Sequence, residues 1–258
     1  AQLYLPDGNV VDLGKDSVCD LQLLEGGRFV NERGTLTYKG DSSEVKVAQY
    51  SEVRIPRGGE YKVVLPDGTI VWLNAESSLR FPTLFTGKER KVYAKGELYF
   101  DVKHDDTKPF IVEVEKDYSV RVLGTEFNLR AYSGFPVVTT LVEGKVKVND
   151  QDIVAGEQAV YSKNDGKTTV RQVEVEQYVA WQEGTFVFRN ERLENVMKTL
   201  GRWYGVEFHF IDERAKEIRI GARFGRYDDM QPIVDMIKKT NLVEVLQTNR
   251  CLYISEKK

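Results

Sequence analysis

Residues 61–73 read YKVVLPDGTIVWL, and this stretch decides the fold class of the chain. Two runs rich in β-branched and aromatic residues lie on either side of a Pro-Asp-Gly turn, which is typical of two strands and their connection. Proline fixes the backbone angle that begins a turn, the aspartate side chain bonds back to the backbone, and glycine supplies the positive φ angle that closes it. The stretch therefore predicts a β-hairpin.

The turn phrase occurs again nearer the N-terminus, where residues 5–11 read LPDGNVV against LPDGTIV at 65–71. One recurrence does not establish a tandem repeat, but it indicates similar hairpins within one β architecture. Short alternating runs separated by Gly, Asp and Asn turns continue to about residue 178, without a helical pattern. We expect residues 1–178 to form a mainly β domain of short, stacked, antiparallel strands. A sandwich and a solenoid-like stack both fit, and so does a barrel.

The pattern changes after Trp181. Apolar residues at helical spacing over 193–204 predict an amphipathic helix, with Asn190 as its N-cap and Gly205 as its left-handed stop. A second helix is predicted from about residue 230. Strands are predicted at 186–188, 206–211, 217–224, 242–247 and 252–255. We therefore expect residues 179–258 to form a small α+β domain of βαβ-βαββ order on one shared sheet.

Composition excludes several classes of function. The chain has 258 residues and a net charge of −3, so nothing favours wrapping of nucleic acid or of an anionic membrane. The basic cluster of Lys88, Arg90 and Lys91 includes Glu89 and is predicted to be a solvated strand or loop. No segment approaches the roughly 20 apolar residues that span a bilayer. Because Ala1 begins the chain without a signal-like stretch, we expect a processed protein or a piece of a membrane-anchored one.

Side chains that support catalysis or metal binding are scarce. His104 stands in a polar Lys-His-Asp-Asp turn and is predicted to be solvated rather than a metal ligand. His209 alternates within a predicted strand. Cys19 and Cys251 form no zinc-type motif and are interpreted as buried free thiols, although one long-range disulfide stays open. The sequence therefore predicts no metal and no cofactor.

An enzyme is the weaker interpretation. The chain carries no G-x-S-x-G, HExxH, Walker or G-x-G-x-x-G motif. A glycosidase needs two carboxyl groups about 5–10 Å apart, and with 40 Asp and Glu residues some pair always qualifies. An envelope carbohydrate-binding protein or glycoside hydrolase on a β scaffold is therefore the alternative function.

Four motifs follow one another along the chain. Residues 65–74 read LPDGTIVWLN, residues 96–102 read GELYFDV, residues 109–112 read PFIV, and residues 122–129 read VLGTEFNL. They resemble the L-P-D-G-(S/T)-x-V-x-L-N, G-E-x-x-F-x-V, P-F-x-V and G-T-x-F-N phrases of the FecR-type anti-sigma regulators. Each motif also has a structural interpretation as turn glycines and core aromatics. We expect these residues to maintain the fold rather than to touch a partner.

The resemblance implies a non-enzymatic role. Residues 181–255 look like the C-terminal domain of these regulators, which is similar to the short signalling domain of secretins and TonB-dependent transporters. Such a regulator controls an extracytoplasmic-function sigma factor through a cytoplasmic segment that this chain lacks. An inner-membrane helix preceding Ala1 would anchor it, with the present part in the periplasm. That part senses the N-terminal signalling domain of a TonB-dependent outer-membrane transporter. We expect the isolated chain to be a monomer.

The predicted partner-binding residues lie in the C-terminal domain. A small sheet with exposed edges offers unpaired backbone groups for strand addition. The edges are predicted at 219–224 or 251–254. Arg219, Arg223, Phe224 and Tyr253 are the residues assigned to binding, since Arg and Tyr are enriched among interface anchors.

Overall fold

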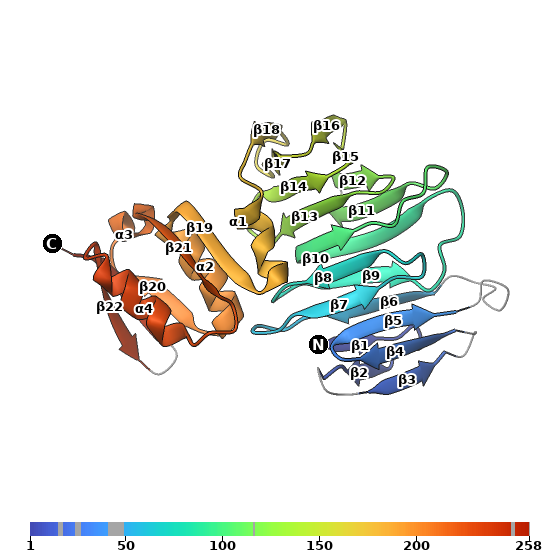
Figure 1. Cartoon of the computed structure of the whole chain (residues 1–258), viewed down its shortest axis with the longest axis horizontal. Coiled ribbons are helices and arrows are strands. Elements are labelled where there is room, and N and C mark those ends of the chain that lie inside the picture. The colour runs from blue at the N-terminus through green and yellow to red at the C-terminus, as the bar shows by residue number, and fades with distance from the viewer. Residues whose placement is uncertain (15–17, 24–26, 41–48, 116, 249–250, 258) are drawn as a thin grey trace. The chain divides into compact units, whose positions relative to one another are not determined.

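The computed structural model describes residues 1–14, 18–23, 27–40, 49–115, 117–248 and 251–257. The chain divides into two units, Ala1–Val175 and Glu176–Lys258. The first unit contains strands throughout its described part (Figure 1). They are β1 (Gln2–Tyr4), β2 (Val10–Asp12), β3 (Cys19–Gln22), β4 (Arg28–Glu32), β5 (Thr35–Lys39), β6 (Tyr50–Arg54), β7 (Tyr61–Val64), β8 (Ile70–Leu73), β9 (Ser78–Pro82), β10 (Arg90–Asp101), β11 (Phe110–Glu115), β12 (Tyr118–Val122), β13 (Glu126–Ala131), β14 (Val137–Glu143), β15 (Lys145–Val148), β16 (Gln151–Val154), β17 (Glu157–Tyr161) and β18 (Thr168–Gln172).

The predicted hairpin is confirmed, because β7 and β8 pair antiparallel around the Pro-Asp-Gly turn. Leu65 N donates to Thr69 O at 2.9 Å, and Asp67 Oδ1 accepts from Thr69 N at 3.0 Å. Gly68 has φ of 88°. The N-terminal phrase over residues 5–9 makes the same two bonds between β1 and β2. Local turn chemistry therefore determines both hairpins.

The strands form one curled sheet folded into two layers. One layer has the order β2-β1-β6-β9-β10-β11-β12-β15-β16. The other has the order β3-β4-β5-β7-β8-β10-β13-β14-β17-β18. The ladders are antiparallel apart from β5–β7 and β10–β11, which are parallel. The long strand β10 belongs to both layers, and the apolar core, with Phe29, Phe100 and Phe127 fully buried, lies within this unit.

Gly96 marks the point where β10 passes from one layer to the other. Residues 90–95 pair with β9 and β11, while residues 96–101 pair with β8 and β13. Gly96 has φ of 87°, and a Cβ there would lie 2.6 Å from the Cα of Ser77. Both the backbone angle and the close approach therefore require glycine.

Replacing Gly96 by alanine is expected to lower the free energy of unfolding by about 3 kcal/mol or more, because backbone strain and a backbone clash combine. Gly68→Ala is the matched control, since its φ is 88° but nothing lies within 4 Å of the added Cβ. That control is expected to cost about 1–2 kcal/mol. Urea denaturation of both variants measures the difference, and equal losses would show that the contact with Ser77 contributes nothing.

Polar residues from three of the sequence motifs meet at one carboxylate. Glu97 Oε2 accepts from Asn74 Nδ2 at 2.8 Å, and Glu97 Oε1 accepts from Asn128 Nδ2 at 3.3 Å. Asn74 Oδ1 also accepts from Ala75 N at 2.8 Å. Asn74 directly follows β8, so these contacts join the end of β8 to β10 and β13, and the motif residues hold neighbouring strands together.

The prediction of a solvated basic cluster is wrong for Arg90. Its side chain is 3% exposed and pairs with Asp67 of the hairpin turn at 2.8 Å. Its neighbour Lys91 is partly exposed and pairs with Glu113, as a solvated strand position should. Arg90 is buried because carbonyl oxygens and a carboxylate surround it, which compensates the loss of water.

The second unit contains both helices and strands. Its elements are α1 (Glu176–Val179), η1 (Ala180–Glu183), β19 (Thr185–Arg192), α2 (Leu193–Tyr204), β20 (Glu207–Phe210), α3 (Glu213–Glu217), β21 (Arg219–Gly225), α4 (Met230–Lys239), β22 (Val243–Thr248) and β23 (Cys251–Glu256). The predicted α+β class is confirmed. The single shared sheet is wrong, since β19 and β21 form one sheet and β20, β23 and β22 form another.

The helices differ from the prediction in two respects, one helix start and one additional helix. The N-cap of α2 is Arg192, whereas Asn190 lies within β19 at φ of 51°, where the β19–β21 register shifts. The short helix α3 was not predicted, and Asp212 caps it by accepting from Ala215 N at 2.9 Å. Gly205 ends α2 in the left-handed conformation, as predicted.

The core of the second unit combines both helices with both sheets. It includes Leu200 from α2, Ile237 from α4, Ile220 from β21 and Ile254 from β23, none of them more than 6% exposed. Within the described residues, no helix is both long and apolar enough to cross a membrane. The two cysteines are free thiols, half-buried rather than buried.

Candidate functional site

Strand β21 has an open edge. It pairs antiparallel with β19 from Arg219 opposite Arg192 to Gly225 opposite Thr185. Among the strands that the structure describes, β21 pairs with no other. A strand paired on one side presents backbone N–H and C=O groups on the other. One of the two edges predicted from the sequence is therefore present.

Arg219 and Arg223 are both exposed and lie four residues apart on the same face of β21. Arg219 Nη1 donates to Asn190 O at 2.8 Å, which joins the start of β21 to the point where the β19–β21 register shifts. Arg223 contacts the carboxylate of Glu176, as Arg189 does from β19. The hydrogen bond from Arg223, with Arg189 beside it, holds the pKa of Glu176 below its usual value. The exposed face of this sheet is therefore rich in guanidinium groups.

Phe224 lies on the opposite side of β21 from these arginines. It is half-buried against the core of the unit, with ring centroids 5.5 Å from Phe186 and 6.0 Å from Phe188. These contacts fix the strand to the core. Phe224 therefore supports the edge from behind rather than offering a fully exposed ring.

The second predicted edge, at residues 251–254, is wrong. Strand β23 is the central strand of its sheet, paired in parallel with β20 and antiparallel with β22. The edges of that sheet are β20 and β22. Tyr253 therefore has no free backbone edge beside it, and it can meet a partner through its side chain alone.

The side chain of Tyr253 belongs to a cross-strand row on the exposed face of this sheet. His209 lies opposite it on β20, with ring centroids 5.5 Å apart, and Leu246 lies opposite it on β22. Tyr253 is 36% exposed and Leu246 is 66% exposed. We call Tyr253, His209 and Leu246 the outer row. Leu246 was not predicted from the sequence. It lies three residues after the buried Val243 in β22, so strand alternation places it on the opposite, exposed face.

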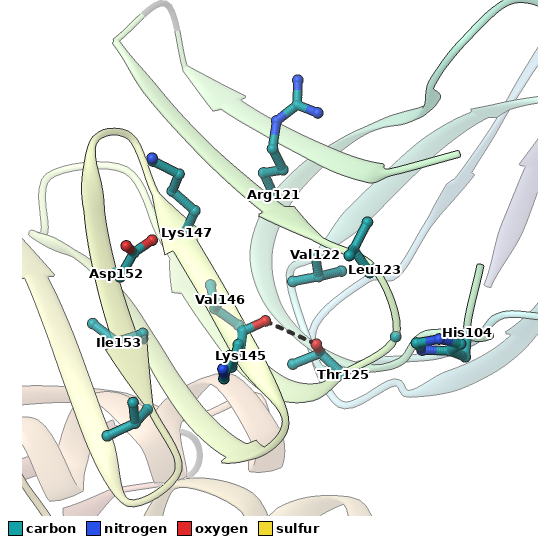
Figure 2. Close-up of a pocket in the computed structure, with 12 residues that line it drawn as sticks. His104, Arg121, Val122, Leu123, Thr125, Lys145, Val146, Lys147, Asp152 and Ile153 are labelled. Atoms are coloured by element: carbon teal, nitrogen blue, oxygen red, sulfur yellow. Dashed lines mark hydrogen bonds between the residues drawn. The ribbon is translucent and has the colours of Figure 1, made fainter. Parts of the chain in front are cut away.

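The first unit contains a cavity of about 650 Å³ between β12, β15 and β16. Figure 2 shows the side chains around it, with Thr125 Oγ1 donating to Lys145 O at 3.0 Å. Its lining includes Asp152 as a single carboxylate and no Phe, Tyr or Trp ring. A glycosidase needs a carboxyl pair, and sugar faces stack on aromatic rings. The cavity therefore does not support the carbohydrate alternative.

Comparisons with known proteins agree with the motifs. Residues 51–147 match the family model described as FecR protein, and residues 185–254 match the model described as FecR, C-terminal. The fold is similar to two crystal structures of a candidate anti-sigma factor from Parabacteroides distasonis ATCC 8503, at 1.65 and 2.50 Å resolution. The first is 26% identical, with a TM-score of 0.73, over 80% of this chain and 99% of that one. The second has the same identity and TM-score over 81% and 100% of the two chains. No curated protein matches the sequence significantly.

Proposed function

Because the chain belongs to the FecR family of anti-sigma regulators, we propose that it relays a signal to a sigma factor by binding another protein. In this proposal it is the periplasmic part of the regulator. The partner is the N-terminal signalling domain of a TonB-dependent outer-membrane transporter. The sigma factor, of the extracytoplasmic-function class, binds a cytoplasmic segment of the regulator outside this chain. An inner-membrane helix, also outside this chain, connects the two parts.

The observation that carries the proposal is the open edge of β21, with Arg219 and Arg223 exposed beside it. A partner strand that adds to this edge gains backbone hydrogen bonds along seven residues. The guanidinium groups then select acidic side chains, because arginine binds carboxylates through paired hydrogen bonds. Backbone pairing supplies affinity, and the arginines supply specificity.

The outer row is the second contact in this proposal. An exposed leucine beside a tyrosine buries apolar area when a partner covers it, and each square ångström contributes about 25 cal/mol. Tyrosine is also frequent among the residues that dominate interface energies. Exposed apolar side chains on a small sheet face are therefore suited to a protein partner rather than to a small molecule.

Reversing both charges, in the Arg219→Glu, Arg223→Glu variant, is expected to weaken transporter-domain binding at least tenfold, about 1.4 kcal/mol. The glutamates would repel the acidic side chains that the arginines select. Isothermal titration calorimetry measures the change against the N-terminal signalling domain of the transporter encoded beside this protein. Circular dichroism verifies that the variant folds.

Arg214→Glu is the matched control for this experiment. Arg214 lies on α3 in the same unit, and its side chain is 82% exposed. The single reversal changes the charge in the same direction on another surface, so the affinity should stay within about twofold of the unchanged chain. An affinity that drops equally in both variants, or in neither, would contradict the assignment of the β21 edge.

A further inference from the structure

The cavity of the first unit arises where two paired strands separate. The ladder between β12 and β15 contains two residue pairs, Val120 with Val148 and Arg121 with Lys147. The next pair in this register would be Val122 with Val146, but these residues are not paired and instead line the cavity. At this point β12 is still paired with β11, and β15 is still paired with β16. The opening is thus an interruption within a continuous layer.

Apolar side chains form the inner wall and part of the rim. Val122, Val146 and Ile153 are at most 2% exposed and belong to the core, whereas Leu123 is 40% exposed and Val154 is 51% exposed. A cavity of about 650 Å³ falls within the ordinary range of ligand sites. The apolar rim indicates that part of a ligand would be apolar.

Positive charge surrounds this apolar wall. Lys145 and Lys147 are exposed on β15, and no carboxylate of the described residues lies within ion-pair distance of either. Lys147 is directly opposite Arg121 in the ladder, and like charges directly opposite each other destabilise a sheet. Arg121 contacts Glu89, and Asp152, the one acid in the lining, lies opposite Lys147 on β16. Figure 2 shows Lys147 with Arg121 on one side and Asp152 on the other. A carboxylate bound near Lys145 and Lys147 would reduce the remaining repulsion.

We propose that this cavity binds an acidic, extended peptide segment of a partner protein, with acidic side chains at alternate positions around one apolar residue. Lys145 and Lys147 are two residues apart, so their Cα atoms are separated by roughly 6.6 Å along the strand. An extended peptide places its own alternate side chains at the same spacing. Two carboxylates can therefore face the two ammonium groups, while the apolar side chain between them points into the cavity.

The strand character of the walls favours a peptide over a small anion. The pairing of β12 with β15 stops at the cavity, and the backbone groups of an unpaired strand edge can pair with an added strand. The cavity belongs to the first unit, whereas the β21 edge belongs to the second. It does not depend on the proposed function, and failure of either proposal leaves the other intact.

The test is fluorescence anisotropy of the whole chain with a labelled Thr-Glu-Val-Glu-Thr peptide. Saturable binding is expected, and Thr-Gln-Val-Gln-Thr should bind at least about tenfold more weakly, since it lacks both carboxylates. Thr-Glu-Glu-Val-Thr has the same composition without the alternate spacing, and it should also bind more weakly. High salt should weaken binding of the Glu-Val-Glu peptide because the pairs are exposed.

Variants locate the site. The Lys145→Glu, Lys147→Glu variant is expected to raise the dissociation constant at least about tenfold. Lys167 is an exposed lysine in the connection between β17 and β18 of the same unit, and Lys167→Glu should leave the dissociation constant unchanged. Absence of saturable binding at millimolar peptide would overturn the proposal. So would equal binding of the three peptides, or an affinity that the two cavity lysines do not affect.

Discussion

Replacing Arg90 by methionine is expected to lower the free energy of unfolding of the first unit by about 3–5 kcal/mol, the usual cost of breaking a buried charge pair. Its guanidinium donates to Lys108 O at 2.8 Å, to Lys103 O at 2.6 Å and to Leu123 O at 3.1 Å. It also donates to Asp67 Oδ2 at 2.8 Å. Methionine fills a similar volume but leaves these four oxygens without that donor, and unsatisfied buried acceptors are costly.

Lys91→Met is the control for Arg90→Met. Lys91 is the adjacent residue of β10, and its side chain is 38% exposed in an ion pair with Glu113 at 3.1 Å. Exposed pairs contribute about 1 kcal/mol or less. Urea denaturation followed by far-ultraviolet circular dichroism measures both variants. Similar midpoints for the two variants would show that the carbonyl cluster around Arg90 does not stabilise the fold.

The second large effect is expected in the other unit, where Arg226→Ala should cost about 3–5 kcal/mol. Arg226 is fully buried. Its guanidinium carbon lies 3.8 Å from the ring centroid of Trp203, 5.2 Å from that of Trp181 and 5.4 Å from that of Phe186. Nη1 also donates to Trp181 O at 3.1 Å. Alanine would remove three desolvated cation–π contacts and leave a cavity.

Tryptophan fluorescence reports this change, because Trp181 and Trp203 both contact the guanidinium. Arg226→Lys keeps the charge but loses the planar guanidinium, so an intermediate loss is expected. Arg214→Ala, at an 82% exposed side chain, should change the stability of this unit by about 0.5 kcal/mol or less. An Arg226→Ala variant as stable as Arg214→Ala would contradict the role of the aromatic cluster.

The sequence predicted what local chemistry determines. The two Pro-Asp-Gly hairpins and the stop of α2 at Gly205 depend on a few consecutive residues, and the structure confirms them. The choice between a sandwich and a solenoid-like stack depends on β10, which joins the layers at Gly96. That choice requires pairings between distant residues, and periodicity contains no information about them.

The same limit applies to buried charge and to strand edges. A basic cluster is usually solvated, and nothing near Arg90 in the sequence shows that three distant carbonyl oxygens surround its side chain. Residues 251–254 have the alternation of any strand, so their central place in the sheet was not predictable. The α3 helix, at five residues, is too short to show a helical period.

The candidate site was predictable in part. Arg219 and Arg223 share one face of a predicted strand, and both are exposed. The positions of Phe224 and Tyr253 could not be predicted without the fold. Phe224 contacts the core, and Tyr253 belongs to the outer row with Leu246. Whether these residues bind the transporter domain stays a prediction.

Hydrogen–deuterium exchange of the whole chain, with and without the transporter's signalling domain, tests the central claim most directly. Amides on an open strand edge exchange readily, and an added strand would protect them. We predict that protection appears over residues 219–225 and is saturable at one signalling domain per chain. Exchange that does not change when both proteins are folded, or protection confined to residues 1–175, would contradict the account.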